Sequence, residues 1–217
     1  MKPDYERSAT AAMETLLSYK IDTAPILPLP IFKHTRGVLT LSFAEVSRGM
    51  GMDRKDAVTM FGSANQDAVT TVHVKDGRLR YVVTYNQRLP FFVLQRALAR
   101  ELGHIVLGHD GSRPDDVRTE EALCFAHHLL CPRPLVKAVQ DSGVKLSIEV
   151  LGNMTGCYEK CLAGMQKLPG VKVPVAINRA VREQFSDYLD NFISYQRTVE
   201  DPAAPVDFGS YMELYEE

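Results

Sequence analysis

Signals for export and for membrane insertion are missing from this sequence. No uninterrupted apolar run approaches the roughly 18 residues that a transmembrane helix needs. The N-terminus, MKPDYERSATAAMETLLSYK, has neither a continuous apolar stretch nor a cleavage site of small residues, so we expect no secretory signal. We therefore expect a cytoplasmic protein without a membrane partner.

Cysteine is also scarce, and several catalytic motifs are absent. The four cysteines are Cys124, Cys131, Cys157 and Cys161, and no two of them form C-x-x-C, so we expect ordinary thiols rather than a disulfide scaffold or a zinc ribbon. There is no G-x-S-x-G, no P-loop and no G-x-G-x-x-G, which leaves hydrolase-elbow and nucleotide-binding functions without support. The net charge of −2 argues against binding to nucleic acid through bulk charge.

The 217 residues are 45% hydrophobic and 24% charged, which is typical of one globular domain with a small appendage. Apolar periodicity, prolines and an Asp-Gly turn predict helices, strands and an extended proline-rich connector. The expected helices are 4–20, 91–108, 115–130, a pair within 145–168 with Thr155 as an N-cap, and 176–198. The expected strands are 37–43, 68–75 and 79–85, and the connector is 24–31.

After Arg197 the chain has six acidic residues and no basic one, so we expect a solvated tail, with a partner-binding tail as the alternative.

The segment LQRALARELGHIVLGHD, residues 94–110, concentrates the polar groups that suggest chemistry. Arg100 and His104 are four residues apart and share a helix face, with Glu101 beside them on a largely apolar rod. This pattern differs by one residue from H-E-x-x-H, in which two histidines hold zinc and the glutamate is the general base. Glu121, on the next predicted helix, is the natural candidate for a third ligand.

These motifs resemble the ImmA/IrrE group of metallopeptidase-like proteins. The similar segments are Glu101-Leu102-Gly103-His104, Leu107-Gly108-His109, and Glu121-Ala122 followed by Phe125-Ala126, Leu129-Leu130 and Pro132. The resemblance covers about residues 5–168 and is specific over 94–132. It implies an α+β, zincin-like domain at 1–168 with a small N-terminal sheet and a motif-bearing helix. A C-terminal helix and the acidic tail would follow at 169–217.

The same resemblance implies zinc-dependent cleavage of a helix-turn-helix repressor, often in mobile elements or stress responses. It assigns Glu101 as the catalytic base and His104 and Glu121 as zinc ligands. The family's first histidine falls on Arg100, and a guanidinium has no lone pair to give to a metal. Zinc is therefore expected if the protein is active, and no cofactor is expected if Arg100 occupies the place of the ion.

Three interpretations of Arg100 stay open. In the first, the guanidinium replaces the metal by pairing with Glu121 or Glu101, and a binding groove remains. In the second, His109, Cys124 or His128 completes a shifted metal site. In the third, Arg100 swings out and water fills the vacancy. The function is then either that of a peptidase-related protein acting on a repressor, or that of a non-catalytic interaction module of a mobile element; a DNA-binding regulator using 146–168 is the weaker alternative.

The neighbouring residues also have structural explanations. We expect His109 to cap the helix that ends at Gly108, with a favourable charge at the negative end of the helix dipole. His127 and His128 are expected at the surface or half-buried, Glu120 in solvent and Cys124 in the core. Arg78 and Arg80 share one strand face, which we expect to be solvated. For each of these residues the structural explanation is the favoured one.

Overall fold

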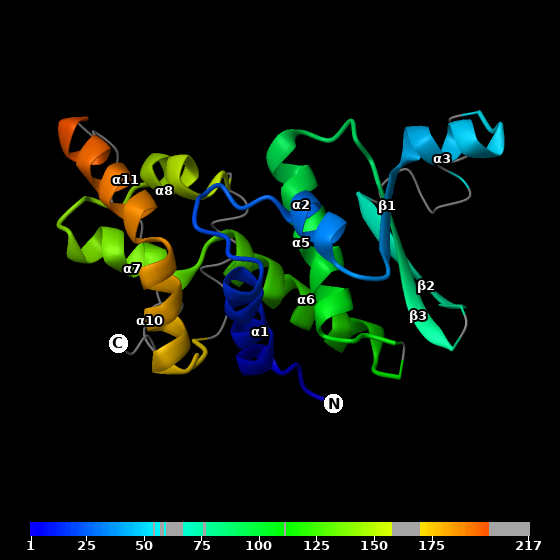
Figure 1. Cartoon of the computed structure of the whole chain (residues 1–217), viewed down its shortest axis with the longest axis horizontal. Coiled ribbons are helices and arrows are strands. Elements are labelled where there is room, and N and C mark those ends of the chain that lie inside the picture. The colour runs from blue at the N-terminus through cyan, green and yellow to red at the C-terminus, as the bar shows by residue number, and fades with distance from the viewer. Residues whose placement is uncertain are drawn as a thin grey trace.

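The computed structural model describes residues 1–53, 55–56, 59, 67–75, 77–110, 112–157 and 170–199. In this part of the chain, helices pack beside a three-stranded sheet, so the predicted α+β class is confirmed. The sheet lies at one end of the long axis and the C-terminal helices lie at the other (Figure 1). No helix in the described ranges is both long enough and apolar enough to traverse a bilayer.

The described elements follow one another in this order: α1 (Tyr5–Ser18), α2 (Pro28–His34), β1 (Val38–Ser42), α3 (Phe43–Met50), β2 (Ala68–Lys75), β3 (Arg78–Tyr85), α5 (Phe91–Val106), α6 (Asp115–Leu130), α7 (Arg133–Asp141), α8 (Ile148–Thr155), α10 (Val175–Gln184) and α11 (Ser186–Thr198). The predicted first helix, the three strands, and the helices at 91–108 and 115–130 are confirmed. Helices α3 and α7 were not predicted.

The sheet has the order β1-β3-β2, with β1 parallel and β2 antiparallel to β3. The β2–β3 hairpin turns at Gly77, whose φ of 68° suits a residue without a Cβ. On the inner face, Ala68 and Val83 are buried, and α5 packs against β2 and β3. Strand β2 therefore lies beside the helix that carries the motif.

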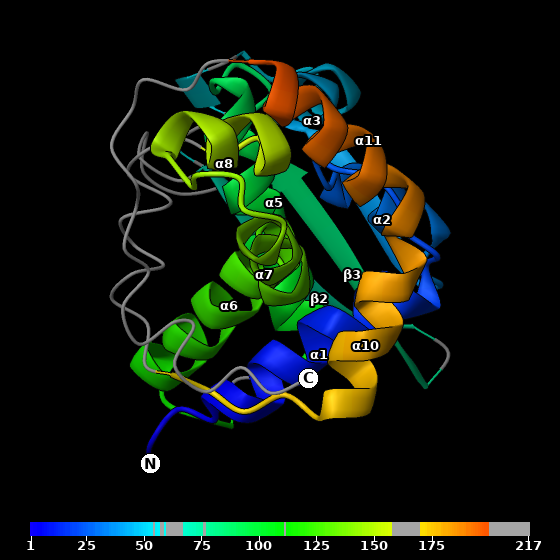
Figure 2. The ribbon, with the colours of Figure 1, turned by 90° about the vertical axis from the view of Figure 1, so that its left-hand side faces the viewer.

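Helices α1, α5 and α6 form the centre of the core, and α10 packs across α1 (Figure 2). Helix α5 ends in a Schellman turn, because the Gly108 N–H donates to the Ile105 carbonyl and the His109 N–H donates to the His104 carbonyl. Gly108 has a φ of 67°, as this turn requires. The turn reverses the chain directly after the motif and brings His109 back toward His104.

Three predictions about elements were wrong. The connector at 24–31 is not extended throughout, because α2 begins at Pro28, where a proline in the first helical turn loses no hydrogen bond. Thr155 is the last residue of α8 rather than an N-cap; its hydroxyl donates to the Leu151 carbonyl. The single helix expected at 176–198 is divided at Phe185 into α10 and α11. The second helix expected before 168, Cys161 and the tail from residue 200 lie outside the described residues.

The burial of two histidines was also predicted wrongly. His127 and His128 lie on the inner sides of α6, with exposed fractions of 5% and 0%. Helix α6 is covered by α5 on one side and α1 on another, so it has little solvent-facing surface near its end. The predictions that Cys124 lies in the core and that Glu120 is exposed are confirmed.

Candidate functional site

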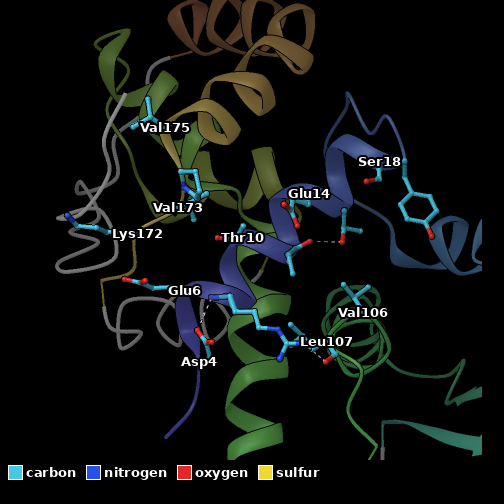
Figure 3. A pocket seen from close by; sticks show the side chains of 15 residues that line it. Asp4, Glu6, Thr10, Glu14, Ser18, Val106, Leu107, Lys172, Val173 and Val175 are labelled. Atoms are coloured by element: carbon cyan, nitrogen blue, oxygen red, sulfur yellow. Dashed lines mark hydrogen bonds between the residues drawn. The ribbon is translucent and has the colours of Figure 1, made fainter.

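The motif residues gather where α5, α6, β2 and the start of α1 meet. A cleft of about 560 Å³ lies here, lined by β2, by Arg100, Glu101 and His104 of α5, and by His109. A larger cleft of about 1030 Å³ lies on the other side of α1, between Glu6, Glu14 and the segment around Lys172 (Figure 3). Glu101 and His104 line the smaller cleft and not the larger one, so we take the smaller one as the candidate site; Glu121 lines neither cleft.

Glu101 is buried on α5 and is held by its neighbour. The Nε and Nη2 atoms of Arg100 donate to Glu101 Oε1 at 3.1 and 2.9 Å. The same Nη2 atom also donates to the Ala68 carbonyl of β2 at 3.2 Å. Arg100 therefore neutralises Glu101 and ties α5 to the strand, and its guanidinium does not pair with Glu121.

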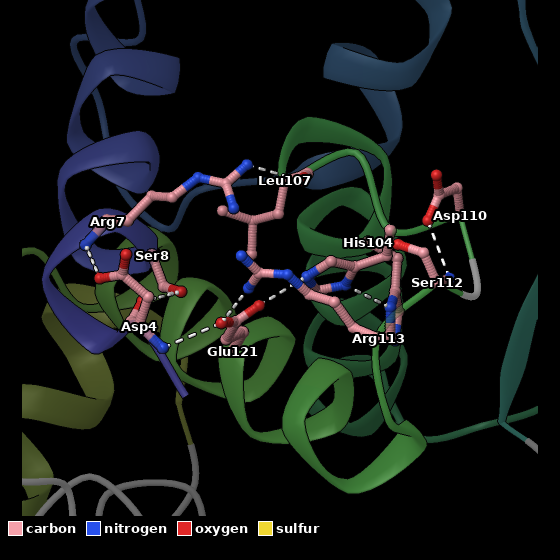
Figure 4. Close-up of polar contacts among 10 residues, drawn as sticks. Asp4, Arg7, Ser8, His104, Leu107, Asp110, Ser112, Arg113 and Glu121 are labelled. Atoms are coloured by element: carbon pink, nitrogen blue, oxygen red, sulfur yellow. Dashed lines mark hydrogen bonds and ion pairs between the residues drawn. The ribbon is translucent and has the colours of Figure 1, made fainter. Parts of the chain in front are cut away.

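Glu121 on α6 is buried as well, and its two oxygens have three donors (Figure 4). Oε1 accepts the Asp4 backbone N–H at 2.9 Å and Arg113 Nη1 at 2.6 Å, and Oε2 accepts from His109 Nε2 at 3.0 Å. Burial by itself would raise the pKa of Glu121, but these three hydrogen bonds outweigh it and hold the pKa below its ordinary value. Glu121 is therefore a carboxylate near neutral pH.

His104 and His109 complete a chain that ends at Glu121. Their Nδ1 atoms are 2.9 Å apart. Burial is the largest cause that lowers the pKa of both imidazoles, to about 4 for His104, where His109 and Arg100 add to the effect. Both rings are then neutral at pH 7, so His109 Nε2–H donates to Glu121 and His104 Nδ1–H donates to His109 Nδ1. This assignment leaves the lone pair of His104 on Nε2.

The structure thus brings Glu101, His104 and Glu121 to one region, but Glu121 contacts His104 only through His109. The backbone turn at Gly108 agrees with the expected cap, whereas the His109 imidazole is buried, with its pKa lowered, and so is not a charged cap. Sequence reasoning missed Arg113 and the Asp4 backbone, because both reach Glu121 from outside the motif helices. A basic residue in a short loop before the helix of Glu121 is the one available signal for Arg113.

The other residues considered for a shifted metal site lie elsewhere. The Cys124 thiol donates to the Tyr5 carbonyl at 3.6 Å, and burial raises the pKa of this thiol to about 12. His128 is fully buried on α6, and burial lowers its pKa to about 3. Neither residue is among those that line the cleft.

These donors, as arranged, do not fit a zinc site. Hydrogen bonds engage His104 Nδ1, both ring nitrogens of His109 and both oxygens of Glu121. Within the described ranges, no three His, Cys, Asp or Glu side chains are grouped as metal ligands. Each buried carboxylate instead has its own guanidinium, Arg100 for Glu101 and Arg113 for Glu121.

Comparison with known proteins adds no relative: no family model, no curated protein and no solved structure matches this chain.

Proposed function

We propose that this protein is a metal-independent relative of the ImmA/IrrE peptidases with a zincin-like fold, which binds a helix-turn-helix repressor without cutting it. The motif resemblance over residues 94–132 supports the family. Arg100 at the position of the first histidine supports the loss of the metal, because a guanidinium cannot ligate.

One observation carries this proposal: the two buried carboxylates of the site are each neutralised by an arginine. Glu101 and Glu121 have side-chain exposures of 5% and 1%, and buried carboxylates require a positive partner. In a zinc peptidase the dication supplies two positive charges at this place. Here Arg100 and Arg113 supply the same total charge, so the site is balanced without an ion.

The cleft beside β2 is the surface that this proposal assigns to the partner. Glu101 is already engaged by Arg100, and the low pKa of His104 makes its Nε2 atom a weak base. Neither group is prepared to activate water. Their arrangement supports a binding role, in which polar groups of a bound segment meet Arg100, Arg118 and Asp115 at the cleft.

Zinc uptake tests the balance of charge. After dialysis against excess zinc and removal of unbound metal, we expect the unaltered protein to retain far less than one equivalent by elemental analysis. Arg100→His combined with Arg113→Ala restores the i, i+4 histidine pair and removes one of the two donors to Glu121 Oε1, so this variant should retain about one equivalent. Arg118→Ala is the matched arginine control and should behave like the unaltered protein.

A stoichiometric zinc ion in the unaltered protein that is lost in Glu121→Ala would overturn the proposal in favour of the peptidase.

Incubation with a helix-turn-helix repressor gives a second readout. We expect an intact complex on size-exclusion chromatography even with a chelator present. Repressor fragments that disappear with the chelator and with Glu101→Gln would show catalysis instead. Salt-dependent duplex binding by this chain alone would favour the DNA-binding alternative.

A further inference from the structure

The β2–β3 hairpin carries an apolar row that the rest of the described structure leaves uncovered. The register places Val72, Val74 and Leu79 on the same face as the buried residues Ala68 and Val83. Their exposed fractions are 45%, 73% and 53%. The hairpin projects away from the helices toward its tip (Figure 1), so this row, named here the hairpin row, faces solvent where α5 no longer covers it.

Beside the hairpin row, the backbone of β2 is an open edge. The Asn86 N–H donates to the Asp67 carbonyl at 2.9 Å, which marks 67/86 as a hydrogen-bonded pair. Antiparallel alternation then turns the backbone groups of Ala68, Thr70 and Val72 away from β3. Arg100 already engages the Ala68 carbonyl, and among the described residues β2 pairs with β3 alone. The open edge therefore runs over residues 70–74.

The opposite face of the hairpin is basic. His73 is paired with Arg80, and Arg78 shares their face two residues along β3. Neither AVTTVHVK of β2 nor RLRYVVTY of β3 contains an acidic residue. An extended segment that fits this edge would have apolar side chains on one face, against the hairpin row, and carboxylates on the other face.

The C-terminal tail has this pattern in part. Residues 211–217 read YMELYEE, so in an extended conformation Met212 and Leu214 share one face with Glu216, while Glu213 and Glu217 share the other face with Tyr211 and Tyr215. No lysine or arginine follows Arg197. Helix α11, which precedes the tail, and the hairpin lie at opposite ends of the long axis (Figure 1). A second copy of the chain can supply the tail without spanning the molecule.

We propose that residues 211–217 of one copy add as a strand to the 70–74 edge of β2 in another copy. Met212 and Leu214 pack on the hairpin row, and Glu213 and Glu217 face His73, Arg78 and Arg80. Because the donor and acceptor surfaces differ, the contact is head-to-tail rather than two-fold symmetric. Thr70 and Val72 also line the cleft assigned to the repressor, so the tail and a repressor would compete for this part of β2, but self-association requires neither the repressor nor a metal.

Complementation between two variants tests the proposal. We expect the full-length protein to self-associate with rising concentration in sedimentation velocity. Val74→Asp places a charge in the hairpin row, and Leu214→Asp places a charge on the apolar face of the tail. Each variant alone should therefore be monomeric. An equimolar mixture should associate, because one variant keeps the tail and the other keeps the edge. Ile148→Asp, which alters another exposed apolar residue, on α8, should associate like the unaltered protein.

Two results would overturn the proposal: a mixture that stays monomeric, or a Leu214→Asp variant that still associates, as two-fold pairing of β2 edges would allow. A peptide readout keeps the receptor protein the same and changes only the tail sequence. A fluorescent peptide of residues 207–217 should bind the Leu214→Asp protein saturably and at least about tenfold more weakly when the peptide carries the same change. Added salt should weaken binding. Equal binding by both peptides would also refute the assignment.

Discussion

Glu121 is the residue on which most of the site's polar contacts meet. It joins the start of α1, the loop before α6 and the turn after α5 through Asp4, Arg113 and His109. The carboxylate is buried, so each donor compensates for part of the hydration that it lost. The same contacts that lower its pKa therefore also hold three separate segments together.

Replacing Arg113 by methionine should expose the energetic role of this pairing. The change removes one of three donors to a buried carboxylate, so we expect the free energy of unfolding to fall by about 2 kcal/mol in urea denaturation. Lys137→Met is the matched control, since its partner Asp141 is on the surface, and it should cost less than about 0.5 kcal/mol. Equal effects of the two changes would contradict the role assigned to Arg113.

Combining Arg113→Met with Glu121→Gln measures the coupling between the two side chains of this pair. The amide that Glu121→Gln introduces carries no charge, so removal of the guanidinium should cost much less in that background. We expect a coupling energy of about 1 kcal/mol or more from the double-mutant cycle. Additive costs would mean that Arg113 stabilises the protein by packing and not by its charge.

At the scale of elements, α5 and α6 approach closely at Gly103. A Cβ there would lie 3.0 Å from Phe125 Cδ1 and 3.2 Å from the Ala122 carbonyl oxygen. The helix pair carries Glu101 and His104 on one member and Glu121 on the other, so the spacing at Gly103 positions the site. The motif glycine is needed for packing and not for backbone flexibility.

Gly103→Ala should therefore destabilise the protein in spite of alanine's higher helix propensity. Alanine gains about 1 kcal/mol in a helix interior, but the forced separation of α5 and α6 costs more, for a net loss of about 1–2 kcal/mol. Gly49→Ala in α3 meets no atom within 4 Å and should stabilise the protein by a few tenths of a kcal/mol or more. Thermal unfolding of both variants compares them directly, and a stabilised Gly103→Ala would show that the helices can separate freely.

At the scale of the whole molecule, buried histidines make stability depend on pH. Burial lowers the pKa of His127 to about 4 and of His128 to about 3, while the unfolded chain has histidines near pKa 6.5. Between these values the unfolded state binds more protons than the folded state. Stability is therefore retained above about pH 6.5 and falls as the pH drops toward 4.

Each such histidine contributes a slope of about 1.4 kcal/mol per pH unit over this range. Urea denaturation at pH 7, 6 and 5 should show this loss of stability. His127→Gln should reduce the slope by the contribution of one protonating group, about 1.4 kcal/mol per pH unit. His34→Gln, an exposed position on α2, is the control for the substitution itself. A slope unchanged in His127→Gln would mean that His127 is protonated in the folded protein.

The C-terminal helix α10 also packs against the N-terminal helix α1. Helix α10 packs on α1 and α7, and Gln184 Nε2 donates to the Leu16 carbonyl at 3.0 Å. This packing holds α11 at the end of the molecule away from the sheet (Figure 1). The proposed addition of residues 211–217 to the β2 edge of another copy is argued from that separation.

Much of the local structure follows from the sequence by itself. The four-residue spacing of Arg100 and His104, the glycine turn at Gly108 and the Asp-Gly hairpin all depend on backbone geometry over a few residues. For this reason the strands and helices α1, α5 and α6 were predictable, and the three motif residues could be named. The zincin-like assignment and the roles of Glu101, His104 and Glu121 stay predictions.

Only the tertiary structure decided which charges meet. Arg100 pairs with Glu101 and with β2, and Glu121 is satisfied by Arg113, His109 and a backbone N–H 117 residues away. The burial of His127 and His128 likewise depends on the elements that cover α6. Such contacts depend on how helices pack over long sequence separations, which local periodicity does not specify.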